Sequence, residues 1–209
     1  MSCPYKRYRN KGRFNVRIIA GTKKGMKLLC PKTQDTRPVT DRIKESLFNV
    51  LRNYDLVEDR RVADVFSGVG SLGLEALSRG AQFVTFVEQD PKIAACLDKN
   101  IAKAGFVAQS RVMRVNAFRV GAPIQPGGAK HDLVFVDPPY VRTHEAGAGS
   151  LLDRLLGTLG HQVTEKGVAV VRTERGVTLL DAYGSFEVID RREWGSMTLA
   201  LYQVRGHGE

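Results

Sequence analysis

The hydrophobic and polar positions of this chain follow two different periods. Between residues 61 and 173, short apolar runs alternate with segments whose apolar residues recur every three or four positions. Short apolar runs indicate buried strands, and the longer period indicates amphipathic helices. The pattern predicts strands over 61–66, 82–88, 111–115, 132–136 and 167–173, with helices over 71–79, 90–104 and 151–159.

Two further β-rich runs, Ser185–Arg191 and Met197–Val204, lie on either side of a short turn and predict an antiparallel pair at the sheet edge. Alternating strands and helices predict an α/β fold, with a Rossmann-like, doubly wound, mostly parallel sheet. Ligands in such folds bind beyond the carboxyl ends of the strands. We therefore expect the functional residues at that edge.

The first quarter of the chain has a different pattern. Residues 1–15 show no periodicity and are expected to form a flexible basic arm. The runs Val16–Ala20 and Met26–Cys30 flank a glycine-bounded basic turn, which predicts a β-hairpin. An amphipathic helix follows, capped by Thr40 or Asp41. Its predicted buried face comprises Ile43, Leu47, Val50, Leu51 and Tyr54.

These patterns divide the chain into three regions. We expect a basic arm over 1–15, an N-terminal extension of hairpin and helix over 16–55, and the main domain over 56–209. No apolar run is long enough to span a membrane. The three cysteines are widely spaced and suit reduced thiols, and no metal-ligand spacing is present. A monomeric cytoplasmic protein without a metal is the expectation.

The charge is concentrated at the N-terminus. The net charge is +10, and residues 1–44 hold 13 of the 32 Lys and Arg but only two of the 22 acids. A basic segment of this kind binds polyanions by releasing counterions from phosphates, although it could also be a solvated tail. The residues expected to contact RNA are Arg17, Lys23, Lys24, Lys27, Arg37 and Arg42. Lys44 near the same helix start could face RNA or water.

A glycine-rich loop follows the first predicted strand. Gly68, Gly70 and Gly73 fit G-x-G-x-x-G between a strand and a helix, where the backbone turns sharply and a ligand approaches closely. Glu88 ends the second strand, where a carboxylate can accept both ribose hydroxyls of a nucleotide cofactor. Asp64 could reach the cofactor or brace the loop. The predicted cofactor-binding residues are Asp64, Phe66, Gly68, Gly70, Glu88, Asn116 and Ala117.

Asn116 follows the third strand and could hydrogen-bond an adenine ring, or it could simply form a turn. The most specific motif follows the fourth strand, and it consists of Asp137, Pro138, Pro139 and Tyr140. The two prolines fix the backbone and remove two amide donors. The Asp137 carboxylate and Pro138 carbonyl could accept both hydrogens of an exocyclic base amine, directing its lone pair toward a methyl donor. Tyr140 could stack on the extruded base.

Together these residues resemble the bacterial 16S rRNA (guanine-N2)-methyltransferase family, RsmD type. The resemblance runs from about Arg17 to Gln203 and is carried by RIIAG at 17–21, RPVTDRIKESLFN at 37–49, the glycine loop, GLEALSRG at 73–80 and VFVDPPY at 134–140. It implies a class I methyltransferase fold with S-adenosylmethionine (AdoMet) as methyl donor. It also implies 16S rRNA as substrate, within the small ribosomal subunit or an assembly intermediate. This chain differs in its longer basic arm and in its Gly/Pro-rich loop at 121–130.

Four other functions compete with this interpretation. A DNA adenine-N6 methyltransferase could use the same tetrapeptide, but it needs groove contacts for which few residues remain. A protein glutamine methyltransferase does not explain the basic N-terminal segment. A nicotinamide-dependent dehydrogenase explains the glycines and Glu88 but not the tetrapeptide. A non-catalytic rRNA-binding assembly factor would have no chemical reason to keep Asp137.

Overall fold

The computed structural model describes residues 16–31, 39–139 and 144–206. The strands are β1 (Arg61–Val65), β2 (Phe83–Val87), β3 (Ser110–Met113), β4 (His131–Val136), β5 (Val163–Glu174), β6 (Ala182–Tyr183), β7 (Phe186–Trp194) and β8 (Met197–Val204). The α-helices are α1 (Asp41–Asn53), α2 (Gly73–Ser78), α3 (Pro91–Ala104), α4 (Ala117–Val120) and α5 (Leu151–Gly160). Short 3-10 helices, η1 (Gly21–Lys23) and η2 (Val107–Gln109), complete the described elements.

The strands form one sheet in the order β3-β2-β1-β4-β5-β8-β7-β6. Strands β1 to β5 pair in parallel, and β8, β7 and β6 continue the sheet antiparallel. Strands β2 and β3 are added on one side of β1, and β4 and β5 on its other side. Ligands of such sheets bind at this switch in strand order, so a cleft is expected at the carboxyl ends of β1 and β4. The predicted mostly parallel sheet with an antiparallel C-terminal pair is confirmed.

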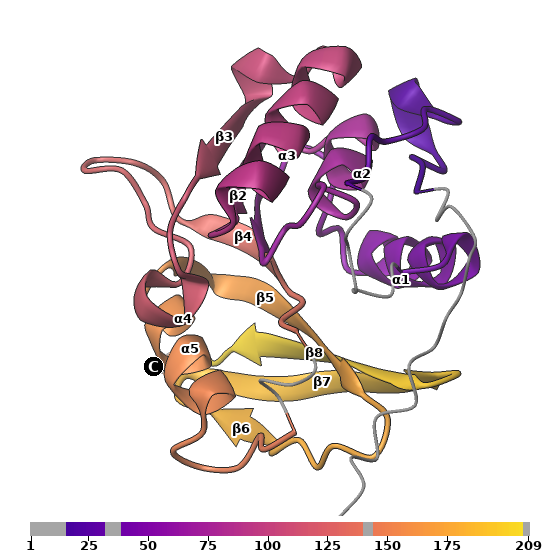
Figure 1. The fold of residues 1–209 in the computed structure, drawn as a ribbon. Helices are drawn as coiled ribbons and strands as arrows, with labels where there is room; N and C mark the ends of the chain where they lie inside the picture. The colour runs from indigo at the N-terminus through magenta and orange to yellow at the C-terminus, as the bar shows by residue number, and fades with distance from the viewer. Residues whose placement is uncertain (1–15, 32–38, 140–143, 207–209) are drawn as a thin grey trace, which may run out of the picture.

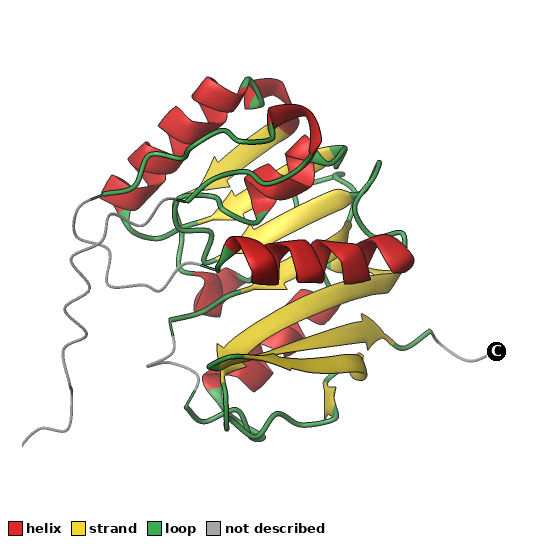
Figure 2. Cartoon of the chain, turned by 90° about the vertical axis from the view of Figure 1, so that its right-hand side faces the viewer, coloured by secondary structure: helices red, strands yellow, loops and turns green. Residues whose placement is uncertain are grey.

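Helices cover both faces of the sheet (Figure 1). Successive strand residues point to opposite faces, so the buried residues form two clusters. Val62 and Val170 face α1, α2 and α3, whereas Ala63 and Val171 face α4 and α5. Figure 2 shows α1 crossing the strands on the first of these faces. The doubly wound α/β fold is confirmed.

Helix α3 begins and ends where the sequence predicts. The Asp90 carboxylate accepts hydrogen bonds from the amides of Lys92 and Ile93, at 2.8 and 3.0 Å. Pro91 occupies the first turn, where an amide has no intrahelical partner. Gly105 ends the helix with φ 77°, a left-handed conformation that costs glycine little.

Other boundaries differ from the prediction. Helix α2 begins at Gly73, two residues late, and β5 begins at Val163, four residues early. The early part of β5 was missed because Thr164, Glu165 and Lys166 are polar, and the register between β4 and β5 is irregular there. The sequence pattern also missed α4 and β6, which have only four and two residues.

Two expectations for α1 were wrong. Thr40 occupies the N-cap position, but its side chain makes no capping hydrogen bond, and Asp41 in the first turn instead pairs with Arg17 at 2.7 Å. Tyr54 was assigned to the buried face but is 43% exposed. The helix ends at Asn53, so Tyr54 is the C-cap and leaves the buried face.

The segment before α1 pairs with itself over a short distance. Arg17 and Lys27 form an antiparallel bridge, supported by Ile18 N–H to Met26 O at 3.0 Å and Leu28 N–H to Val16 O at 2.8 Å. The predicted hairpin is therefore present, but its two arms are joined around η1 by a single β-bridge and form no regular strands. The pairing of the two arms stops at Ile19, because the amides of Ile19 and Ala20 bind a side chain of α2.

That side chain is the buried carboxylate of Glu75. It accepts hydrogen bonds from the amides of Ile19 (2.8 Å) and Ala20 (3.0 Å), and from Arg79 Nε (2.8 Å). The Lys44 ammonium lies 3.6 Å away, and both side chains are fully buried. Lys44 also donates to Arg17 O at 2.7 Å. The expectation that Lys44 could face RNA or water was wrong, because the ammonium neutralises a carboxylate inside the protein.

Replacing Glu75 with alanine should therefore destabilise the fold strongly. The substitution leaves a buried ammonium without its counterion and two backbone amides without their acceptor, which costs on the order of 3–5 kcal/mol. Urea unfolding would measure this loss. Glu45→Ala, at an exposed position of α1, is the control and should change the unfolding free energy by less than about 0.5 kcal/mol. Equal stability of the two variants would show that the cluster is not structurally important.

Candidate active site

The loop between β1 and α2 has an unusual backbone. Phe66, Gly68 and Gly70 have φ values of 64°, 55° and 88°, all in the left-handed region. A Cβ on Gly70 would lie 2.5 Å from Leu97 Cδ1, and one on Gly73 would lie 2.3 Å from Phe86 Cε1. These two glycines are therefore required by packing against α3 and β2. That Gly68 and Gly70 also contact a cofactor stays a prediction.

Asp64 stabilises this loop by a hydrogen bond from its last glycine. Its carboxylate is 2% exposed and accepts a hydrogen bond from Gly73 N–H at 2.8 Å. Burial raises the pKa of Asp64 well above its ordinary value, and the nearby Asp137 and Glu88 charges raise that pKa further. Of the two roles considered for Asp64, the structure provides the bracing contact.

Glu88 lies at the carboxyl end of β2 and reaches the same loop. Its Oε2 accepts from Gly68 N–H at 3.0 Å, and its Oε1 accepts from Asp90 N–H at 2.8 Å. Each carboxylate oxygen has two lone-pair sites, so both oxygens can accept a further hydrogen bond. Glu88 is half-buried at the strand end, and its geometry suits a pair of ligand hydroxyls.

Asn116 lies at the carboxyl end of β3, and its Oδ1 accepts from Phe118 N–H at 2.9 Å, capping α4. The side chain is exposed, whereas Ala117 is buried. The rings of Phe66 and Phe118 pack with centroids 4.7 Å apart. This aromatic pair connects the loop after β1 with α4, and it provides apolar ring surface near the ends of β1 and β3. Phe118 was not predicted.

The tetrapeptide after β4 lies at the same edge. Asp137 N–H donates to Val65 O at 3.4 Å, so the motif starts beside the end of β1. Pro138 is buried and Pro139 is exposed, while Tyr140 lies outside the described residues. The Asp137 carboxylate forms an ion pair with Arg172 Nε of β5. Sequence reasoning missed Arg172, because the pair joins two strands 35 positions apart and has no local signal.

The structure thus brings together the ends of β1, β2, β3 and β4 with the side chains of Asp64, Phe66, Glu88, Asn116 and Asp137. This edge carries three carboxylates, and burial raises the pKa of Asp137 despite Arg172. Several carboxylates close together favour a cationic ligand. The donor and acceptor set fits a positively charged nucleotide-like cofactor such as AdoMet.

The predicted RNA-binding residues lie elsewhere, on the N-terminal extension. Lys24, Lys27 and Arg42 are exposed. Arg17 is exposed but paired with Asp41, and the Lys23 ammonium lies 5.8 Å from the centroid of the Phe106 ring. Arg37 lies outside the described residues.

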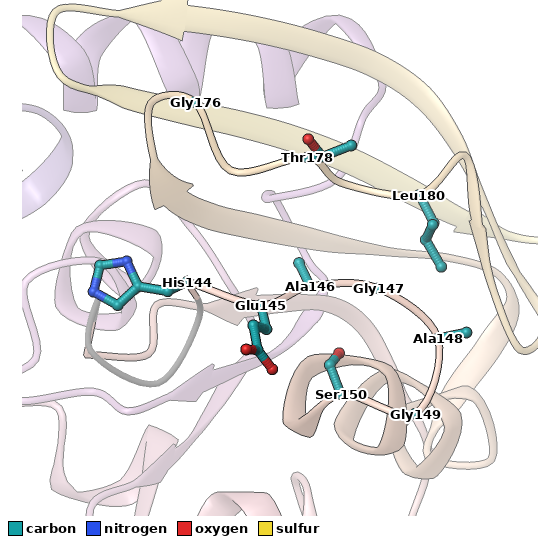
Figure 3. Close-up of a pocket in the computed structure, with 10 residues that line it drawn as sticks. All are labelled: His144, Glu145, Ala146, Gly147, Ala148, Gly149, Ser150, Gly176, Thr178 and Leu180. Carbon is teal, nitrogen blue, oxygen red and sulfur yellow. The ribbon is translucent and has the colours of Figure 1, made fainter.

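Two cavities occur away from the glycine loop. One of about 550 Å³ lies between the loop His144–Ser150 and the segment containing Gly176, Thr178 and Leu180 (Figure 3). The buried hydroxyl of Tyr183 holds both walls, donating to Ala146 O at 2.5 Å and accepting from Leu180 N–H at 3.1 Å. The other, of about 300 Å³, lies between η1 and the carboxyl end of α1.

Comparison with known proteins gives a consistent result. The family described as "Conserved hypothetical protein 95" matches residues 16–203. The chain is 33% identical to ribosomal RNA small subunit methyltransferase D of Escherichia coli K12, over 98% of both chains. It is 31% identical to YlbH of Bacillus subtilis, an rRNA methyltransferase candidate, over 91% of this chain and all of that protein.

The fold is also shared with solved structures. The methyltransferase candidate yhhF from Escherichia coli superposes with a TM-score of 0.75 at 32% identity, over 92% of this chain and 99% of that one. The fold is therefore that of a class I methyltransferase, as the sequence predicts.

The two substitutions Asp64→Ala and Asp64→Asn should differ in stability. Alanine leaves the Gly73 amide without its acceptor, at a cost of about 1–3 kcal/mol. Asparagine can still accept that hydrogen bond and removes a buried charge, so it should be near neutral or stabilising. Urea unfolding at neutral pH would compare them. Equal destabilisation would mean that the carboxylate does not brace the loop.

The pH dependence of stability gives a second prediction. The folded Asp64 carboxyl keeps its proton to a higher pH than the unfolded one, whose ordinary pKa is 3.8. Above pH 3.8 the folded state therefore binds more protons at Asp64 than the unfolded state does. As a result, the unfolding free energy falls as pH rises from 3.8 toward the folded pKa of Asp64. Asp64→Asn should remove that contribution. An unchanged pH profile in the variant would contradict the raised pKa.

Proposed function

The chain belongs to the family described as conserved hypothetical protein 95, and from this premise we propose that it methylates the N2 amine of a guanine in 16S rRNA with AdoMet. The resemblance expected from the sequence is confirmed by the match to that family over residues 16–203. The rRNA methyltransferase names of relatives that align along nearly the whole chain support an enzyme acting on rRNA. The finer assignment to guanine N2 rests on the family resemblance.

One observation carries this proposal. A largely buried carboxylate, Asp137, stands at the carboxyl end of β4, beside the ends of β1, β2 and β3 where Phe66, Glu88 and Asn116 lie. Class I methyltransferases place the methyl donor at this edge. The amine acceptor and the proposed cofactor residues therefore share one edge of the sheet.

The residues of the cleft suggest how transfer proceeds. Bound AdoMet would supply an electrophilic methyl group on a sulfonium. The Asp137 carboxylate and the Pro138 carbonyl accept the two N–H groups of the guanine amine, which frees its lone pair from the ring. Transfer of that methyl group would form a C–N bond as the C–S bond breaks, and the methylated amine would lose one proton to solvent. The negative charge of Asp137 stabilises the positive charge that develops on nitrogen.

We propose that Glu88 accepts the ribose hydroxyls of AdoMet and that Asn116 contacts its adenine. The Phe66–Phe118 pair forms an apolar wall beside the ring.

No helix among the described residues is long and apolar enough to cross a membrane. A cytoplasmic enzyme that acts on the small subunit or an assembly intermediate agrees with the rRNA substrate.

Methyl transfer from isotope-labelled AdoMet tests the proposal. The substrates would be small subunits lacking the modification, their extracted rRNA, and unmethylated DNA, each digested to nucleosides. We expect label in N2-methylguanosine from subunits or rRNA. Label only in DNA adenine would replace this function with that of a DNA enzyme, and tight RNA binding without transfer would indicate an assembly factor.

Asp137→Ala should abolish transfer while leaving AdoMet affinity within about twofold. The carboxylate acts on the base, and the predicted cofactor contacts come from other residues. Single-turnover kinetics and calorimetric AdoMet binding would be measured together. Turnover close to that of the unmodified enzyme would refute the role of Asp137.

Charge reversal of the exposed lysines, as Lys24→Glu with Lys27→Glu, should weaken rRNA binding and flatten its salt dependence. Losing two phosphate contacts would reduce the slope of log K against log salt by about 2. The matched control reverses Lys130 and Lys166, exposed residues near β4 and on β5. The same slope in both double variants would exclude the N-terminal extension as the docking surface.

A further inference from the structure

Arg172 and Asp137 face one another from neighbouring strands. In the parallel register of β4 and β5, Val136 pairs with Val171, so Asp137 is level with Arg172. Arg172 follows Val168 and Val170 on the face covered by α1. The ion pair is largely shielded from water, with side-chain exposures of 10% for Arg172 and 18% for Asp137.

We propose that Arg172 is a positioning residue for methyl transfer, holding Asp137 as an anion and presenting one of its carboxylate oxygens to the guanine amine. The inference rests on the proposed function, because it assigns a role at the same site. Arg172 Nε donates to Oδ1. This contact holds Oδ1 at Arg172, and the lone pairs of Oδ2 can accept from the base.

The charges around Asp137 explain why such a partner is needed. Burial raises the pKa of Asp137, and Arg172 lowers it through its charge and hydrogen bond. The opposite neighbour, β1, contributes Asp64, whose own pKa is raised by the charge of Asp137. A second carboxyl would favour the neutral acid at Asp137. Arg172 opposes the effect of burial on Asp137, and a guanidinium stays charged at any working pH.

Stability alone does not account for this pair. Apolar residues of similar volume often replace buried ion pairs without loss of stability. The neighbouring face positions Val168 and Val170 are apolar, so an apolar residue would also suit position 172. A neutral Asp137 would carry a proton on one oxygen and would lose its negative charge opposite the developing ammonium. An arginine at position 172 therefore fits the chemistry proposed for Asp137.

The test compares Arg172→Met and Arg172→Lys with Arg175→Met. Arg175 is an exposed arginine just beyond β5, paired with Glu193, and serves as the control. Removing the cation raises the pKa of Asp137, so the acidic limb of the kcat profile should move to higher pH by about 1–3 units in Arg172→Met. The KM for AdoMet should change little. Arg172→Lys keeps the positive charge but lacks the planar guanidinium. The acidic limb of its kcat profile should therefore lie at the pH of the unmodified enzyme, while its kcat should be only partly recovered.

A measurement without turnover separates this inference from the proposed function. NMR titration of the ¹³C-labelled Asp137 carboxyl, assigned by its loss in Asp137→Asn, should show a higher pKa in Arg172→Met than in the unmodified enzyme or Arg175→Met. An unchanged carboxyl titration in Arg172→Met overturns the inference, whatever the enzyme methylates. If the titration shifts but the acidic limb of kcat does not, Arg172 does not act in transfer.

A folding defect in Arg172→Met would leave Arg172→Lys to decide the question. Lysine carries its ammonium one methylene farther from the backbone than arginine carries Nε, and it lacks the planar guanidinium. It therefore cannot reproduce the Nε contact, and kcat should fall at least tenfold while AdoMet affinity is unchanged. In an Asp137→Asn background the same Arg172→Lys change should have little further effect on kcat, because the carboxylate it positions is absent. Full activity of Arg172→Lys, or an equal loss in both backgrounds, would refute the positioning role.

Discussion

The buried carboxylate of Glu75 determines how the N-terminal extension joins the main domain. It binds two consecutive backbone amides of the extension, a buried lysine of α1 and an arginine of its own helix. A buried charge requires such compensation, since desolvating an unpaired carboxylate costs several kcal/mol. The stretches 17–21, 37–49 and 73–80, which carry much of the family resemblance, therefore meet at one point. Their residue types follow from that charge balance as much as from any substrate.

Charge is divided between two parts of the molecule. The edge of the sheet carries Asp64, Glu88 and Asp137, and burial together with the charges of the other two raises the pKa of Asp64. The N-terminal extension exposes Lys24, Lys27 and Arg42. An anionic cleft suits a cationic methyl donor, and a basic extension suits a polyanion. Under the proposed function, this separation would keep RNA phosphates away from the acidic edge, where the base amine reacts.

The sequence predicted those features whose causes are local. Asp90, Pro91 and Gly105 define α3 because capping and left-handed backbone depend on neighbouring residues. The glycine loop and the tetrapeptide were found for the same reason. Lys44 was misjudged because its partner lies in another helix, and the pairing of Arg172 with Asp137 was missed because it joins two strands. A charged side chain gives no sign in the sequence that it is buried, so such pairs become visible only with the fold.

The same polar contacts that anchor the extension also hold the cofactor loop. Helix α2 receives the Asp64 hydrogen bond at Gly73 and binds the extension through Glu75, only two residues later. On α3, the buried Asn100 side chain accepts from Leu29 N–H and donates to the carbonyls of Leu29 and Val69. Both bridges connect the glycine loop directly to the N-terminal extension.

This arrangement has a consequence for how one guanine could be selected. Two short polar bridges leave little freedom for the extension to move relative to the glycine loop, because each buried group must keep its partner. The position of the exposed lysines relative to the glycine loop is then a fixed property of the fold. An enzyme built in this way can choose its nucleotide by where the surrounding RNA docks, with few contacts to the base itself.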